Sequence, residues 1–400
     1  MNDKRLDALD ALRFIAASIV ILTHFVEVFI VPKYGFDELY GIGTIECWLG
    51  IFSVLCFFYL SGYVIAFATD YSIKNNSFIL SNYIKKRFFR IYPVVWGALI
   101  YALIIIMIMK LFSLEGLEDK GLYLSGDIWS EPNYISISHF LYSIFLPPSG
   151  FYGGFFNVPL WTISYEIGFY FLYGAVLSML LNYGVKKTVF IVLFIIFSLV
   201  TWYSITISPE ISFFSCVIEF LSKFPCWNFI GFLFVWLLGV GCFYLTKYTH
   251  TFRLYIVIVI LFTAVCLVLG IHYVLKVPYI YNPYSGLSKY SCPDYSVLMT
   301  ISYSLPLLAL IYVLQFTGLP KMFNVLGVLG KRYSYSLYAT HFILIILSFG
   351  ILYSYLPNYG YLSFTLLFVT IYVVANIIAY FFAKLFENRD LWMKLFRVNK

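Results

Sequence analysis

The sequence predicts an all-α integral membrane protein, a bundle of about ten transmembrane helices with both termini in the cytoplasm. Composition is the first observation behind this prediction, since 62% of the 400 residues are hydrophobic and only 11% are charged. Soluble domains carry about a quarter charged residues, and so few charges could not cover the surface of a protein of this size in water. Lipid, in contrast, tolerates exposed apolar side chains.

The second observation is a series of apolar runs, each long enough to cross the ~30 Å of hydrocarbon in a bilayer. These runs lie at residues 11–31, 48–69, 91–112, 157–182, 188–207, 228–246, 252–272, 296–317, 333–352 and 361–386. The first run carries Arg13 and His24 and lacks a small-residue cleavage site after its apolar stretch. We therefore interpret it as a retained helix rather than a signal peptide.

The third observation is the distribution of positive charge. If the N-terminus is cytoplasmic, the predicted inner segments hold about three times as many lysines and arginines as the outer segments, as the positive-inside rule requires. The net charge of +7 thus reflects topology, and no nucleic-acid partner is expected. We predict a multi-pass protein of the cell (inner or plasma) membrane, with one transmembrane domain over residues 1–390 and a short cytoplasmic tail over 391–400.

Two longer segments are predicted to lie outside the membrane. Residues 113–156 form the longest loop and contain a short amphipathic stretch, Ile135–Phe145. Residues 273–295 form a second outer loop that is rich in Tyr, Pro and Gly. Aromatic residues on such a loop suit sugar stacking, but an interfacial aromatic belt is the simpler interpretation.

Ionisable residues inside the first helix are the first functional candidates, because a charge in hydrocarbon is costly unless it is paired or hydrated. Arg13 and His24 are eleven residues apart, close to three full helical turns, so they share one face and lie ~16 Å apart along the axis. Asp10 lies one turn before Arg13 on nearly the same face, so that it could pair with Arg13. The alternative is that Arg13 is a snorkelling anchor and His24 a core histidine.

The second candidate is the basic run from Lys85 to Pro93. Arg87 and Arg90 are three residues apart, so they share a helix face at the predicted cytoplasmic mouth of the bundle. Such a face could bind the phosphates of a nucleotide-bearing ligand, since the guanidinium fork matches phosphate oxygens. Ordinary positive-inside charge is the alternative, and it suffices for Lys85 and Lys86.

Two further polar runs enter membrane helices. Leu160–Glu166 opens the fourth helix and brings Glu166 into the hydrocarbon, where a carboxylate needs a partner or a proton. Gly330–His341 opens the ninth helix with several hydroxyls and a histidine. From these two runs we select as supporting residues Trp161, Ser164, Ser336, Tyr338 and His341.

The cysteines add little. None has the spacing of metal ligands, and no metal site is predicted. Cys216, Cys226 and Cys292 fall in predicted outer segments, where a disulfide between two of them is possible.

Five motifs, in order along the chain, resemble those of the acyltransferase-3 family of polytopic membrane acyltransferases. They are Leu9–Arg13 followed by His24, then Phe58–Tyr63, Arg87–Pro93, Leu160–Glu166 with Phe169–Tyr170, and Ser334–Tyr338 with His341. One of them alone would be weak, but five in this order over residues 9–341 are specific. The chain departs from the family pattern at Phe14 and at Ile167–Gly168, which puts the fit of the substrate in question.

The resemblance implies about ten helices and transfer of an acyl group, usually acetyl, from cytoplasmic acyl-coenzyme A. It implies as acceptor a hydroxyl of a cell-envelope or exported carbohydrate. The positions that match the family's catalytic residues are Arg13 and His24, supported by Glu166. Arg13, Arg87 and Arg90 are the positions expected to bind the donor.

The residues suit this chemistry in their own right. Acyl transfer from a thioester to an alcohol needs a base and a stabilised oxyanion, and His24 is the best base candidate because its unperturbed pKa lies near neutrality. Glu166 could orient His24 or hold the acceptor, and His341 is the alternative base. A transporter of polysaccharides or lipid-linked sugars, or a polysaccharide polymerase, would also place charges in a helical bundle. Broken-helix repeats would favour the transporter, and none is found in the sequence.

Overall fold

The computed structural model describes residues 3–30, 33–34, 40–115, 137–146, 155–207, 227–248 and 321–396. Within these ranges all regular secondary structure is helical and no strand occurs. The elements are α1 (Asp3–Phe25), the π-helical η1 (Val26–Ile30), α3 (Tyr40–Lys74), α4 (Leu80–Leu111), α5 (Ile137–Phe145), α6 (Leu160–Ile207), α8 (Trp227–Tyr248), α11 (Lys321–Leu352), the 3₁₀-helical η2 (Tyr353–Asn358), α12 (Tyr361–Phe386) and α13 (Arg389–Leu395).

Six helices of the described chain are long and apolar enough to span a membrane, which confirms the all-α membrane prediction. They cover Asp7–Ile30, Leu49–Lys74, Leu80–Leu111, Leu160–Val192, Asn324–Asn358 and Tyr361–Phe386. The apolar part of α8, Gly231–Tyr244, is shorter. The predicted spans 252–272 and 296–317, the loop 273–295 and the cysteines Cys216, Cys226 and Cys292 lie outside the described residues.

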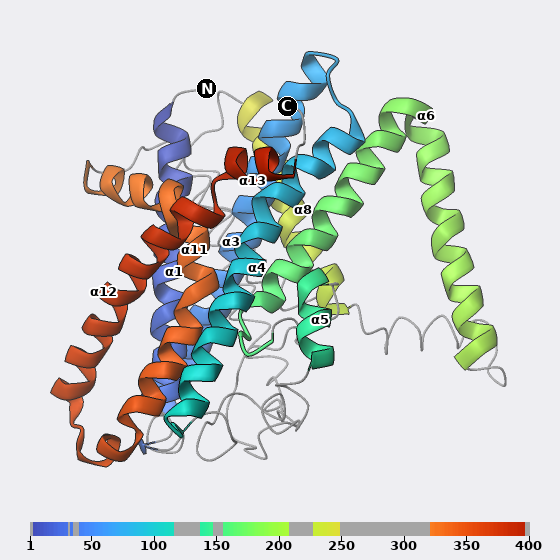
Figure 1. Cartoon of the computed structure of the whole chain (residues 1–400). Helices are drawn as coiled ribbons and strands as arrows, with labels where there is room; N and C mark the ends of the chain where they lie inside the picture. Colours follow the sequence, from blue (N-terminus) through green and yellow to red (C-terminus); the bar gives the residue numbers. More distant parts are fainter. Residues whose placement is uncertain are drawn as a thin grey trace.

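The predicted spans 157–182 and 188–207 correspond to the two halves of α6. These halves meet at Gly184, where φ is 74° and ψ is 171°. A positive φ is nearly free of cost for glycine and unfavourable for other residues, so Gly184 is where the helix breaks. Figure 1 shows the chain rising along the first half and descending along the second.

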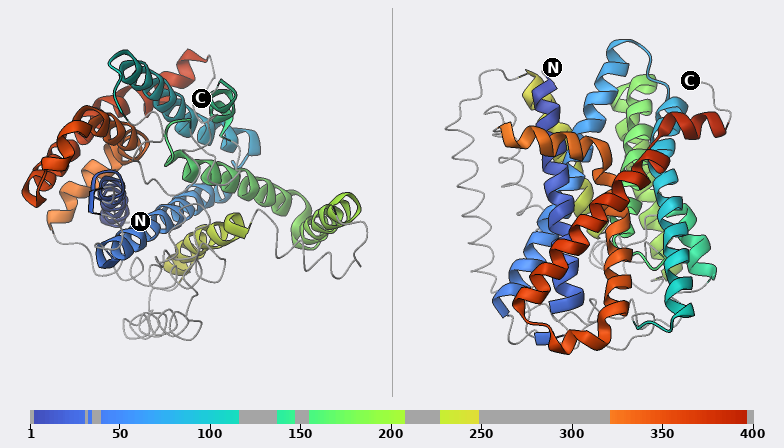
Figure 2. Two further views of the ribbon diagram at one scale, coloured as in Figure 1. Left: turned by 90° about the horizontal axis from the view of Figure 1, so that it is seen from below. Right: turned by 60° about the vertical axis from the view of Figure 1, so that its left-hand side comes forward.

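The bundle is built around close packing of α1 on α11 and of α3 on α8. Seen along its axis, α1, α3, α4, α6 and α11 surround a common centre (Figure 2). Gly330 permits the contact between α1 and α11, because a side chain there would overlap the carbonyl oxygen of Asp10. Small residues allow such close approach of helix backbones in membranes.

The segment predicted as the outer loop 113–156 differs from its expectation. Its helical stretch is confirmed as α5, but α5 lies beside the middle of α4 rather than beyond its end. The Tyr92 hydroxyl of α4 donates to the carbonyl of Phe145 at 2.9 Å, and Trp96 Nε1 donates to the carbonyl of Ile144 at 3.2 Å. The chain therefore enters the bundle before α6 begins.

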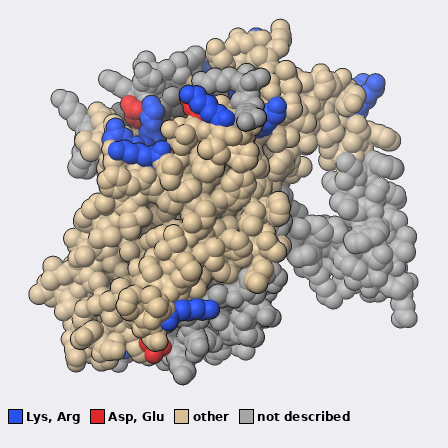
Figure 3. Space-filling view, viewed as in Figure 1, with Lys and Arg blue, Asp and Glu red and all other residues tan. Residues whose placement is uncertain are grey.

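One end of the bundle carries many of the charged side chains that the structure describes. The start of α1 and the end of α12 lie at the same end (Figure 1), and lysines and arginines gather there on the face that Figure 3 shows. The middle of that face is largely free of charge, as expected of a surface in contact with lipid.

Candidate active site

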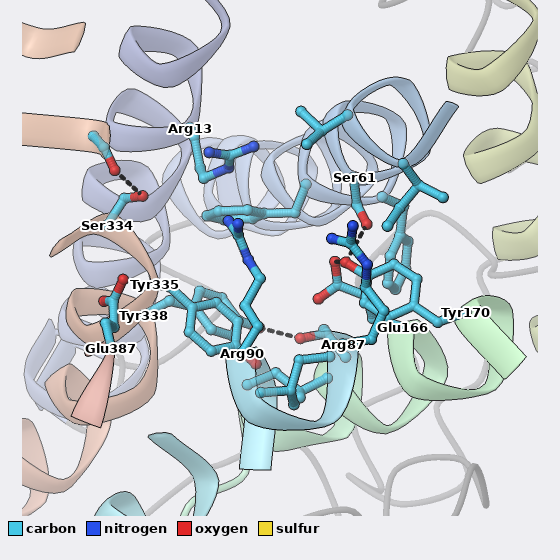
Figure 4. A pocket seen from close by; sticks show the side chains of 18 of the residues that line it. Arg13, Ser61, Arg87, Arg90, Glu166, Tyr170, Ser334, Tyr335, Tyr338 and Glu387 are labelled. Carbon is cyan, nitrogen blue, oxygen red and sulfur yellow. Dashed lines mark hydrogen bonds between the residues drawn. The ribbon is translucent and has the colours of Figure 1, made fainter. Parts of the chain in front are cut away.

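A polar cavity lies at the centre of the bundle, between α1, α3, α4, α6 and α11. Its volume is about 70 Å³. The charged side chains that line it are those of Arg13, Arg87, Arg90, Glu166, Lys331 and Glu387. Figure 4 shows the guanidinium groups of Arg13, Arg87 and Arg90 directed into this space. The sequence selects four of these residues, which lie on three different helices, and the structure brings them together. They are Arg13, Arg87, Arg90 and Glu166.

Arg13 reaches the cavity from α1 and is held by its own helix. Its Nη1 atom lies 2.7 Å from Oδ1 of Asp10, one turn earlier, which confirms the predicted pair. Both side chains are largely buried, with exposed fractions of 14% and 17%. The ion pair offsets part of the cost of placing either charge at this depth.

Arg87 and Arg90 enter from one face of α4, as their spacing predicts. The Arg87 guanidinium lies 5.7 Å from the ring centre of Tyr83 and 5.9 Å from that of Tyr170. Its buried Nε atom has no hydrogen-bond partner in the described part of the chain. The Arg90 side chain is accessible because it borders the cavity. Among the described residues, neither arginine forms an ion pair with a carboxylate, so both retain donors for an anionic ligand.

Glu166 ends a chain of hydrogen bonds that runs from α8 through α3 to α6. Trp236 Nε1 donates to Ser61 Oγ at 3.2 Å, and Ser61 Oγ lies 2.9 Å from the Tyr170 hydroxyl. The Tyr170 hydroxyl donates in turn to Glu166 Oε1. This chain fixes the carboxylate at the cavity wall rather than toward lipid.

Glu387, which the sequence analysis did not select, also lines the cavity. It follows α12, and its Oε1 atom accepts from Ser336 N at 2.8 Å and from Ser336 Oγ at 2.6 Å. Burial raises the pKa of the Glu387 carboxyl, although the Ser336 hydrogen bonds act in the opposite direction. Ser336 therefore contacts the site through Glu387.

The other supporting residues of α6 and α11 have mainly structural contacts. The Tyr338 hydroxyl lines the cavity, donates to the Pro159 carbonyl at 3.0 Å and lies 2.8 Å from Thr162 Oγ1. Trp161 packs against the aromatic ring of Phe232 at 5.6 Å. Ser164 is fully buried and donates to the Trp161 carbonyl at 2.6 Å.

His24 lies near the end of α1 and, among the described residues, is not part of the cavity lining. Its Nδ1 atom is 2.7 Å from Oε2 of Glu27. Its ring stacks on that of His341, with centres 5.5 Å apart, and meets the ring of Phe342 edge-on at 5.1 Å. His24 therefore faces α11, whereas Arg13 of the same helix reaches into the cavity. The carboxylate that contacts His24 is Glu27, not Glu166.

His341 is fully buried, and its protonation pattern follows from its contacts. Its Nδ1 atom lies 2.8 Å from the Tyr338 carbonyl and 3.1 Å from the Leu337 carbonyl, so Nδ1 carries the hydrogen. Its Nε2 atom is then an acceptor, and no described residue donates a hydrogen bond to it. An unpaired buried acceptor is destabilising by about 1–3 kcal/mol unless a donor reaches it.

Comparison with known protein families shows the family to which the chain belongs. A family model described as an acyltransferase domain, that of the acyltransferase-3 family, matches residues 6–384. The chain belongs to the acyltransferase-3 family. The resemblance seen in the five motifs is thereby confirmed over essentially the whole chain, and the protein is a membrane acyltransferase. No curated protein and no solved structure gives a significant match.

Proposed function

We propose that this acyltransferase moves an acyl group, with acetyl as the first candidate, from cytoplasmic acyl-coenzyme A to a hydroxyl of a cell-envelope or exported carbohydrate. The observation that carries the proposal is the central cavity, in which Arg87 and Arg90 face inward without a carboxylate partner among the described residues. Two free guanidinium groups at membrane depth favour an anionic ligand. Family membership favours acyl transfer over transport or polymerisation of a polysaccharide.

The donor is proposed to enter from the basic end of the bundle. By the positive-inside rule this end faces the cytoplasm of a cell (inner or plasma) membrane, where acyl-coenzyme A is found. The cavity holds about five water molecules at ~15 Å³ each, so it suits a phosphate-sized group rather than a whole coenzyme. We therefore assign phosphate contacts to Arg13, Arg87 and Arg90, with the acyl-bearing arm extending along α1.

His24 is proposed as the base. Arg13 and His24 are eleven residues apart on one continuous helix, a rise of ~16 Å, which a pantetheine arm can cover. The acceptor hydroxyl gives its proton to His24 while its oxygen attacks the thioester carbonyl carbon. The carbon–sulfur bond then breaks, and the departing thiolate takes the proton from His24. Glu166 lines the same cavity as the three arginines, and its predicted role in holding the acceptor stays a prediction.

Turnover of the purified full-length chain in lipid nanodiscs tests this proposal. Acetyl-coenzyme A is the donor, envelope carbohydrate extracted from the source cells is the acceptor, and both free thiol and new O-acetyl esters are measured. We expect the parent to form both products in equal amounts and the Arg90→Gln variant to need far more donor. Failure to release thiol or form ester with the full carbohydrate extract would overturn the proposal.

A further inference from the structure

The imidazole of His24 is held on three sides. Glu27 contacts its Nδ1 edge at 2.7 Å, His341 stacks on its face with an interplanar angle of 24°, and Phe342 meets it edge-on. All three contacts come from two elements, η1 and α11. Of the two ring nitrogens, Nδ1 contacts Glu27, and no hydrogen bond to Nε2 is found among the described residues.

Glu27 is unusual for a residue in a membrane span. It lies within Asp7–Ile30, and its side chain is 19% exposed. Its only ion-pair partner among the described residues is His24. A carboxylate at this depth is costly and therefore a functional candidate by default. It also lies in the π-helical turn that directly follows α1, and such turns are frequent at functional sites.

We propose that Glu27 is the positioning residue of this enzyme, which orients His24 and selects the tautomer that acts as base. This inference rests on the proposed function, and in particular on the role of His24. Glu27 accepts the Nδ1 hydrogen of His24, so Nε2 keeps its lone pair and faces the acceptor hydroxyl. When Nε2 takes the hydroxyl proton, the ring becomes a cation, and the Glu27 carboxylate stabilises that cation until the thiolate of coenzyme A removes the proton.

The uncharged ring of His341 is also part of this arrangement. Its Nδ1 hydrogen is shared between two backbone carbonyls, so the ring that stacks on His24 presents an uncharged face. Among the described residues, the charged or titratable groups that contact His24 are Glu27 from η1 and His341 from α11. Of these two groups only Glu27 is negatively charged, so Glu27 balances a positive charge that forms on His24.

The test compares Glu27→Gln and Glu27→Asp with the parent in full-length protein, with acetyl-coenzyme A as donor. The extracted envelope carbohydrate is the acceptor, and thiol release is followed from pH 5 to 9. Gln keeps the size but removes the charge and can offer a donor to Nδ1, which favours the wrong tautomer. We expect kcat to fall at least about 100-fold, and KM for acetyl-coenzyme A to stay within about twofold. Asp keeps the charge on a side chain that is one methylene shorter. Glu27→Asp is therefore expected to retain more of the rate than Glu27→Gln.

The split between kcat and KM, together with the effect of Asp, separates positioning from simple structural support. Loss of the positioning carboxylate should lower kcat while KM for acetyl-coenzyme A and the melting temperature stay near the parent values. Glu115→Gln, at an exposed carboxylate after α4, is the matched control and should keep the parent kcat. If Glu27→Gln does not fold, Glu27→Asp carries the same test, with a smaller loss of kcat and parent values of KM and melting temperature.

Two outcomes distinguish this inference from the proposed function. If His24→Ala is inactive while Glu27→Gln keeps the parent rate and pH profile, the role of Glu27 is wrong and the function stands. If His24→Ala itself turns over acetyl-coenzyme A at the parent rate, the proposed base is wrong. A Glu27→Gln variant that loses rate and melting temperature together, with no more rate retained in Glu27→Asp than in Glu27→Gln, would reduce Glu27 to a structural role and overturn the inference.

Discussion

Replacement of Arg90 by lysine tests the donor site with the least disturbance to the protein. Arg90 lies on α4 with its side chain accessible to the cavity, and no described carboxylate pairs with it. Lysine keeps the charge and the long aliphatic stem. Its single ammonium group, however, cannot make the two parallel hydrogen bonds that the planar guanidinium group makes to a phosphate. The substitution therefore removes one charged hydrogen bond to a phosphate and leaves the general attraction in place.

The expected increase in KM follows from the loss of that one hydrogen bond. A hydrogen bond to a charged group contributes about 1.5–3 kcal/mol, which corresponds to an increase of about 10- to 150-fold in KM for acetyl-coenzyme A. Arg90→Gln also loses the charge and should have a larger effect. Because the side chain faces a polar cavity rather than the packed core, neither variant should lower the melting temperature by more than a few degrees.

Initial rates over a range of acetyl-coenzyme A concentrations measure the effect, with the melting temperature measured on the same samples. Lys86→Gln is the matched control, because Lys86 lies on the same helix, is exposed and does not line the cavity. It should keep the parent KM. Parent-like KM values for both Arg90 variants, or an equal change in the control, would refute the assignment of phosphates to this cavity.

Three further results are expected. The His24→Ala variant should insert and fold but form no ester. The His341→Ala variant should keep measurable activity but have a lower melting temperature, because the substitution leaves a cavity at a fully buried site. Rates and melting curves of both variants check this. Gly330→Val should destabilise the bundle by about 1–3 kcal/mol or more through overlap with α1. Gly241→Ala, whose added methyl group would meet no described atom within 4 Å, should melt like the parent. Burial raises the pKa of Glu387 above 4.5, so the folded chain holds that proton more tightly, and this contribution to stability is lost as pH rises through the raised pKa. Glu387→Gln should therefore show a smaller decline in melting temperature from pH 4.5 toward neutrality, and an unchanged decline would contradict the pKa direction.

The fold class and much of the cavity follow from sequence because both depend on local rules. Apolar length predicts a membrane helix, and helical spacing predicts which residues share a face. Asp10 and Arg13 pair because they are one turn apart, and Arg87 and Arg90 enter one cavity for the same reason. Convergence of three helices on that cavity is a tertiary property, and only the family motifs indicated it.

Glu27 carried a signal that the sequence analysis did not use. It lies inside the first apolar run, three residues after His24, and a carboxylate in hydrocarbon is itself a functional indication. Glu387 carried no such signal. It follows the last span, and its contact with Ser336 depends on how α12 packs beside α11. The depth of α5 could not be predicted either, because it is fixed by hydrogen bonds from α4.

A structure of the full-length protein with acetyl-coenzyme A bound is the most direct test of the central claim. The account predicts coenzyme phosphates in contact with Arg87 and Arg90, and a thioester carbon within reach of His24 Nε2. It also predicts that the coenzyme enters from the end of the bundle where α1 begins. A donor bound away from the three arginines, or one whose thioester lies on the far side of the bundle from His24, would contradict it.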